Sequence, residues 1–221
     1  MKLLSQAARV ERSVAPWHGT GATFRVACLD TTLHHIMAPF IAETGADIAD
    51  LRPVRAQDIY ATLEESIDLA VSTAPPPRGK NSKVLANVPI SVQYVPGMLD
   101  TTFTGAIEEI AMVPIVISGK GSAVEYAVMD AAHGKGLDLI ISSVVSSGRM
   151  AQAAAASRQV IAITTEPSHF DLKVKQLMVN GAILTIPFYA VWDLKHPSDE
   201  KIRQLTASLA EWLERRQPWQ S

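Results

Sequence analysis

Strand-like and helix-like segments alternate along most of this chain. Residues 23–29 mix apolar, aromatic and β-branched side chains, which is typical of a buried strand. Residues 33–41 then place apolar side chains at helical spacing, and Gly45 stands where a helix C-terminal cap belongs. A candidate helix over residues 57–66 and a strand over 67–72 continue the pattern, which predicts βαβ units and a mainly parallel sheet.

A second cycle follows a loop that contains three consecutive prolines, Pro75 to Pro77. The pattern predicts one long strand over residues 84–95, with turn residues after it. Further strands are expected over residues 46–52, 113–118, 137–144, 160–165 and 182–192, and further helices over residues 123–132, 146–157 and 198–216. Two α/β cycles closed by an amphipathic helix indicate two lobes.

Length and charge limit the classes of partner. The 221 residues are 48% hydrophobic, enough to bury the core of one domain or of two small lobes. Twenty basic and 22 acidic residues give a formal charge of −2. No broad positive field is therefore available to hold phosphate backbones, and we do not expect this stretch itself to bind nucleic acid.

Cysteine content and the N-terminal sequence favour a cytoplasmic protein. The single cysteine, Cys28, cannot form an internal disulfide, as expected in a reducing compartment. Residues 1–12 lack the apolar core of a secretory signal, and charged residues or prolines interrupt every apolar run that could span a membrane.

Catalytic and metal-binding motifs are not found. Residues 119–122 (Gly-Lys-Gly-Ser) lack the first glycine of a phosphate-binding loop, and residues 19–22 (Gly-Thr-Gly-Ala) precede a strand where a dinucleotide fingerprint would follow one. The adjacent His34 and His35 point about 100° apart on a helix and do not share one ion easily. The sequence predicts no enzyme, no catalytic residues, no metal and no cofactor.

Three segments together resemble the effector-binding domain of LysR-type transcriptional regulators. Residues 65–71 (Glu-Ser-Ile-Asp-Leu-Ala-Val) look like the family segment in which a helix end runs into a strand of the first lobe. Residues 109–116 (Glu-Ile-Ala-Met-Val-Pro-Ile-Val) and 184–192, which end in Trp192, are similar to two further family segments in the same order. The resemblance covers nearly the whole chain from Thr23.

The resemblance implies a type 2 periplasmic-binding-protein fold. This fold is α/β, with two Rossmann-like lobes of mixed, mainly parallel sheets flanked by helices and a ligand cleft between them. Lobe one would comprise residues 21–97 and 190–221, and lobe two residues 98–189. Residues 1–20 would be the end of a linker helix and a linker, and the winged helix-turn-helix domain that binds DNA in the family is not in this sequence.

Polar residues where predicted strands end are the candidate effector site. Ligands of open α/β sheets bind beyond the carboxyl ends of the strands, and helix starts there present unpaired N–H donors. The expected effector contacts are Asp30, Thr31, Thr32, Arg55, Ser72, Ser118, Lys120, Ser122, Ser146 and Ser147. The resemblance places Thr31, Thr32, Ser122 and Ser147 among the family's effector contacts, and Arg55 or Lys120 would supply a charge for a carboxylate. Taken singly, Ser and Thr at helix starts are also ordinary N-caps.

The resemblance implies a cytoplasmic ligand sensor that reaches DNA only through the missing N-terminal domain. Its partners would be a small, anionic metabolite and a second copy of the chain, giving a homodimer, or a tetramer for the full-length regulator. Closure of the lobes would reposition the DNA-binding heads. The alternative is the solute-binding protein of a transporter, which has the same fold, and an enzyme of this fold has no support in any motif.

Overall fold

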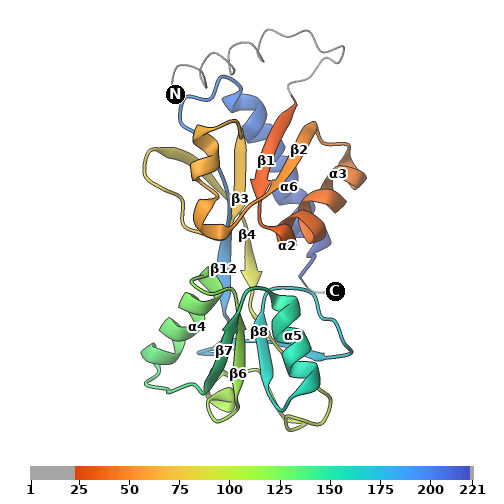
Figure 1. Cartoon of the computed structure of the whole chain (residues 1–221), viewed down its shortest axis with the longest axis vertical. Helices are drawn as coiled ribbons and strands as arrows, with labels where there is room; N and C mark the ends of the chain where they lie inside the picture. Colours follow the sequence, from red (N-terminus) through yellow and green to blue (C-terminus); the bar gives the residue numbers. More distant parts are fainter. Residues whose placement is uncertain (1–22, 220–221) are drawn as a thin grey trace. The chain divides into compact units, whose positions relative to one another are not determined.

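The computed structural model describes residues 23–219, and the predicted linker helix therefore lies outside the described residues. The described chain forms two compact units, one of residues 23–86 and 188–216 and one of residues 87–187 and 217–219 (Figure 1). The chain passes between them after Ala86, after Pro187 and after Arg216. No helix among the described residues is long and apolar enough to cross a membrane.

The first unit contains a mixed five-stranded sheet in the order β2-β1-β3-β12-β4. Its strands are β1 (Phe24–Cys28), β2 (Ile48–Pro53), β3 (Leu69–Ser72), β4 (Lys80–Pro89) and β12 (Thr185–Asp193). Its helical segments are α2 (Asp30–Thr32), the π-helical turn η1 (Leu33–Met37), α3 (Ala38–Thr44), the 3-10 turns η2 (Ala56–Asp58) and η3 (Ala61–Glu64), and α6 (Asp199–Arg216). β1 runs parallel to β2 and β3, whereas β12 is antiparallel to β3.

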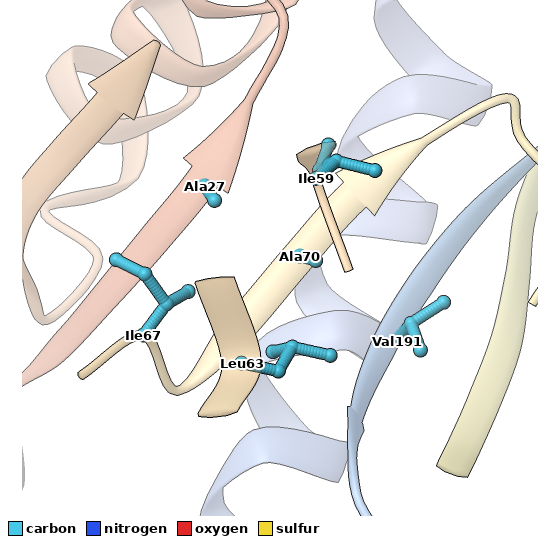
Figure 2. Packing of buried hydrophobic residues seen from close by; sticks show 6 residues of the cluster. All are labelled: Ala27, Ile59, Leu63, Ile67, Ala70 and Val191. Carbon is cyan, nitrogen blue, oxygen red and sulfur yellow. The ribbon is translucent and has the colours of Figure 1, made fainter. Parts of the chain in front are cut away.

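Apolar side chains of three neighbouring strands and of the segment between β2 and β3 form a core cluster of the first unit. Figure 2 shows Ala27 of β1, Ala70 of β3 and Val191 of β12 next to Ile59, Leu63 and Ile67 from the segment between β2 and β3. All six are almost fully inaccessible to solvent. α6 packs on α3, where the Trp212 and Phe40 rings meet edge to face at 5.8 Å and the Trp212 indole donates to the Glu43 carboxylate at 2.8 Å.

The second unit contains another mixed five-stranded sheet, in the order β7-β6-β8-β5-β9. Its strands are β5 (Ser91–Tyr94), β6 (Ile115–Ser118), β7 (Ile141–Val145), β8 (Ile161–Thr164) and β9 (Lys173–Gln176), with a separate hairpin of β10 (Met178–Val179) and β11 (Ala182–Ile183). Its helical segments are η4 (Ile107–Ile110), α4 (Ala123–Gly134) and α5 (Gly148–Ser157). α5 packs Ala151 and Ala155 against Val116 and Ala162 of the sheet.

Two sequence-based expectations about elements are wrong. The strand expected over residues 84–95 is two strands, because β4 ends at Pro89 and β5 pairs instead with β8 and β9 of the second sheet. The helix expected over residues 57–66 is the pair of 3-10 turns η2 and η3. There the Thr62 hydroxyl donates to the Ile59 carbonyl at 2.6 Å, a local bond that competes with helical hydrogen bonding.

The Asp68 carboxylate, in the segment 65–71 that resembles the LysR family, forms hydrogen bonds with two other parts of the first unit. Its Oδ2 accepts the backbone N–H of Arg25 at 2.9 Å, and its Oδ1 lies 3.1 Å from Nε2 of the buried His196. The other ring nitrogen of His196 accepts the Ser198 N–H at 3.1 Å. His196 is therefore the tautomer that donates from Nε2, and Asp68 joins β1 and β3 to the loop that leads into α6.

We expect Asp68→Ala to lower the free energy of unfolding by about 2–4 kcal/mol, because it leaves the His196 and Arg25 N–H donors without their acceptor. Urea denaturation followed by circular dichroism measures this change. Asp130→Ala, at an exposed position of α4, is the matched control and should stay within about 0.5 kcal/mol of the original chain. Equal urea midpoints for the two variants would contradict the role given to Asp68.

Candidate functional site

Three parallel strands of the first unit end at one edge of its sheet. Cys28, at the end of β1, pairs with Pro53 of β2 and with Val71 of β3. The predicted site residues of this unit lie where these strands end: Asp30–Thr32 after β1, Arg55 after β2, and Ser72 as the last residue of β3. The structure therefore brings all of them to the same edge.

The helix that follows β1 begins without a side-chain cap. The N-cap residue is Leu29 and not Thr31 or Thr32, and the Leu29 carbonyl accepts the first helical bond from Leu33 at 2.9 Å. Asp30, Thr31 and Thr32 thus lie in the first turn, where backbone N–H groups have no partner within the helix. The Asp30 carboxylate lies 3.6 Å from the His34 ring. This helix start has N–H donors available for an anionic or acceptor-bearing ligand.

Ser72 and Arg55 complete this edge in different ways. Ser72 is buried, and its hydroxyl accepts the Ala74 N–H at 3.1 Å. The Tyr60 hydroxyl donates to the Ala74 carbonyl, and burial raises the pKa of Tyr60 to about 12, so the phenol remains a donor. Arg55 is exposed at the start of η2. Ser72 thus helps to fix a turn, while Arg55 presents a charge to solvent.

The second unit repeats this arrangement with β7, β6 and β8. Ser118 ends β6 and pairs with Val145 at the end of β7, and β8 runs parallel on the other side of β6. The other predicted site residues of this unit come next along the chain: Lys120 and Ser122 after β6, and Ser146 and Ser147 after β7. Lys120 is exposed and Ser118 is buried.

Both helix starts of the second unit have side-chain caps. The Ser122 hydroxyl accepts the Glu125 N–H at 3.3 Å, and the Glu125 carboxylate accepts the Gly121 N–H at 2.6 Å. At α5 the Ser147 hydroxyl accepts the Met150 N–H at 3.4 Å. Ser122 and Ser147 are therefore N-caps in the structure.

Glu166 is a polar residue of this edge that the sequence analysis missed. It follows β8, and its Oε1 accepts the Gly148 N–H of α5 at 2.7 Å. A carboxylate therefore occupies the start of α5, where the helix dipole favours negative charge. Gly148 makes room for it, because a Cβ there would lie 2.3 Å from the Thr164 hydroxyl and 2.5 Å from the Glu166 carboxyl carbon. The contact joins residues 18 positions apart in sequence.

Other candidate chemistry is limited in the described residues. Among residues 23–219 no group of three or more His, Cys, Asp or Glu side chains is placed to hold a metal ion. Cys28 is buried at the end of β1, and its pKa is raised to about 12 by burial and, to a smaller extent, by the nearby Asp30 charge.

Comparison with known proteins identifies the fold. No protein-family model matches the sequence, and no curated protein matches it. The structure is similar to the LysR family regulator HinK from Pseudomonas aeruginosa, with a TM-score of 0.72 at 14% identity over 96% of this chain and 77% of that one. It is also similar to the reduced regulatory domain of OxyR2 from Vibrio vulnificus, with a TM-score of 0.70 at 12% identity over 89% of this chain and 98% of that one.

The chain has the fold of a LysR regulatory domain. The full-length LysR regulator CbnR, solved with its target DNA, gives a TM-score of 0.72 at 16% identity and covers all of this chain and 79% of that one. The likeness confirms the expected α/β fold with two lobes. The candidate site residues described above therefore lie at the strand ends of a LysR-type fold.

We expect Gly148→Ala to destabilise this LysR-type fold by about 1–3 kcal/mol, because the added methyl group overlaps Thr164 and Glu166. Differential scanning calorimetry would show a fall in melting temperature of about 2–4 °C for each kcal/mol. The control is Gly134→Ala near the end of α4, where a Cβ meets no atom within 4 Å. It should be neutral or slightly stabilising, and a Gly148→Ala variant as stable as this control would refute the close approach of Glu166.

We expect native Cys28 to resist alkylation. With a pKa of about 12, only about one thiol in ten thousand is ionised at pH 8, and the side chain is fully buried. Iodoacetamide at pH 8, followed by intact-mass analysis, should leave the folded chain unmodified and modify it once in urea. Rapid alkylation of the folded chain would show that the end of β1 is open to reagents.

Proposed function

We propose that this chain is the ligand-sensing regulatory domain of a LysR-type transcriptional regulator. It binds a small-molecule effector at the strand-end residues of its two units, and binding changes the activity of a DNA-binding domain carried elsewhere in the full-length protein. The regulator works in the cytoplasm as a homodimer or, at full length, a tetramer. DNA is contacted only through the other domain.

The uncapped helix start at Thr31 and Thr32 is the observation that carries this proposal. The other two helix starts at the strand ends have Ser caps and carboxylates that accept backbone N–H groups. No side chain caps the helix after β1, where the Asp30 carboxylate lies beside His34 instead. Ligands of α/β sheets bind at such an edge. A carboxylate of the effector would accept the free N–H groups of Thr31 and Thr32, with Arg55 as a further positive group.

The solved structures favour a regulator over a transporter protein. HinK and CbnR are LysR family transcriptional regulators, and the OxyR2 structure is a regulatory domain. Likeness to these proteins at 12–16% identity supports the proposal through the fold. Because these proteins are regulators, they also support a sensor without catalytic activity. The strand-end residues of this chain that form side-chain hydrogen bonds cap helices or fix turns.

A thermal-shift screen with organic acids tests the proposed function. A ligand at one hundred times its Kd stabilises the folded chain by about 2.7 kcal/mol, which a melting curve resolves. We expect at least one acid to raise the melting temperature, and Thr31→Leu to weaken its binding by about tenfold or more through loss of access to the helix start.

Thr44→Leu is the matched control, because Thr44 is the last residue of α3, at the far end of the same continuous helix. It should leave the affinity unchanged. If Thr31→Leu bound the ligand as tightly as the Thr44→Leu control, the helix start after β1 would not be part of the site.

A further inference from the structure

A group of three polar side chains lies where β8 ends and α5 begins. Gln93 of β5 donates from Nε2 to the Glu166 carbonyl at 2.8 Å and to the Ser91 hydroxyl at 3.0 Å. Gln152 of α5 donates from Nε2 to the Pro167 carbonyl at 2.8 Å. The two amides therefore direct their N–H groups to adjacent carbonyls of one segment, which holds them within the second unit.

The oxygen atoms of both amides remain without partners. Gln93 is 1% exposed and Gln152 is fully buried, and neither Oε1 accepts a hydrogen bond from any described residue. Buried polar side chains in folded proteins almost always have a partner for each polar atom. Two amide oxygens without a hydrogen-bond donor therefore lie beside the segment Glu166–Pro167.

The Glu166 carboxylate adds a negative charge to the same group. Its Oε1 accepts the Gly148 N–H, while its Oε2 has no hydrogen-bond or ion-pair partner among the described residues. Arg149, the residue after Gly148, directs its guanidinium to the His169 ring at 2.9 Å. We call Glu166, Gln93 and Gln152 the acceptor cluster. Its atoms without a hydrogen-bond partner are the two amide Oε1 atoms and the Glu166 Oε2, which belongs to a charged carboxylate.

We propose that the acceptor cluster binds a cationic N–H donor of the effector, a primary ammonium or a guanidinium. This inference rests on the proposed function and narrows its ligand class. Such a group supplies several N–H donors and the charge that complements Glu166, and hydrogen bonds between charged groups are the strong ones. This helix start does not suit an effector carboxylate, because the Gly148 N–H already donates to the Glu166 carboxylate.

Nuclear magnetic resonance titration of the ¹⁵N-labelled chain with butylammonium, ethylguanidinium and butyrate tests the inference. The two cations should shift the Gly148 backbone amide and the side-chain amides of Gln93 and Gln152. Glu166→Gln keeps the oxygen that accepts the Gly148 N–H and removes the charge. It should weaken cation binding by about tenfold or more.

Glu109→Gln is the matched control. The Glu109 carboxylate also accepts backbone N–H groups at the start of a helical turn, those of Thr104, Gly105 and Ala106, but no unpartnered amide oxygen is bonded to that segment. Cation binding should be the same in this variant as in the original chain. The titration of the original chain locates the site by itself, even if Glu166→Gln were to unfold.

The outcomes separate this inference from the proposed function. Cation-induced shifts at the cluster that are lost in Glu166→Gln support the inference. Shifts of these amides by butyrate alone, or equal cation affinity in the two variants, overturn it. If organic acids stabilise the chain in the thermal-shift screen while no cation shifts the cluster, the inference fails and the proposed function stands. If neither class of compound binds anywhere, both fail.

Discussion

Parallel pairing of three strands within each sheet is the constraint on which the rest of the structure depends. Because β2, β1 and β3 run in one direction, as do β7, β6 and β8, their carboxyl ends reach a single edge of each sheet. Each helix or turn that follows a strand must begin at that edge. The helix-start residues, and the N–H donors they expose, are gathered there by topology and not by local sequence.

The N–H groups at the helix starts have different partners in the two units. In the second unit, Glu125 and Glu166 each accept an N–H at the start of a helix, so negative charge is supplied from within. In the first unit the helix start at Thr31 has no side-chain cap. On this basis we propose an anionic group of the effector for the first unit and a cationic group for the second.

Local signals in the sequence predicted much of the fold. Gly45 ends α3 with a left-handed backbone, φ 65°, as its position after the apolar pattern indicated. The amphipathic pattern of residues 198–216 predicted a helix, and α6 (Asp199–Arg216) forms there. The small β10–β11 hairpin was missed, although its turn residues Asn180 and Gly181, both with positive φ, are a common hairpin signal. The Glu166 contact with Gly148 had no such local signal, because it depends on how β8 and α5 pack.

A crystal structure of the chain with a small molecule that stabilises it tests the central claim most directly. We expect the ligand to accept hydrogen bonds from the backbone N–H groups of Thr31 and Thr32, at the carboxyl edge of β1. A ligand bound away from the strand ends of both sheets, with that helix start facing only solvent, would contradict it.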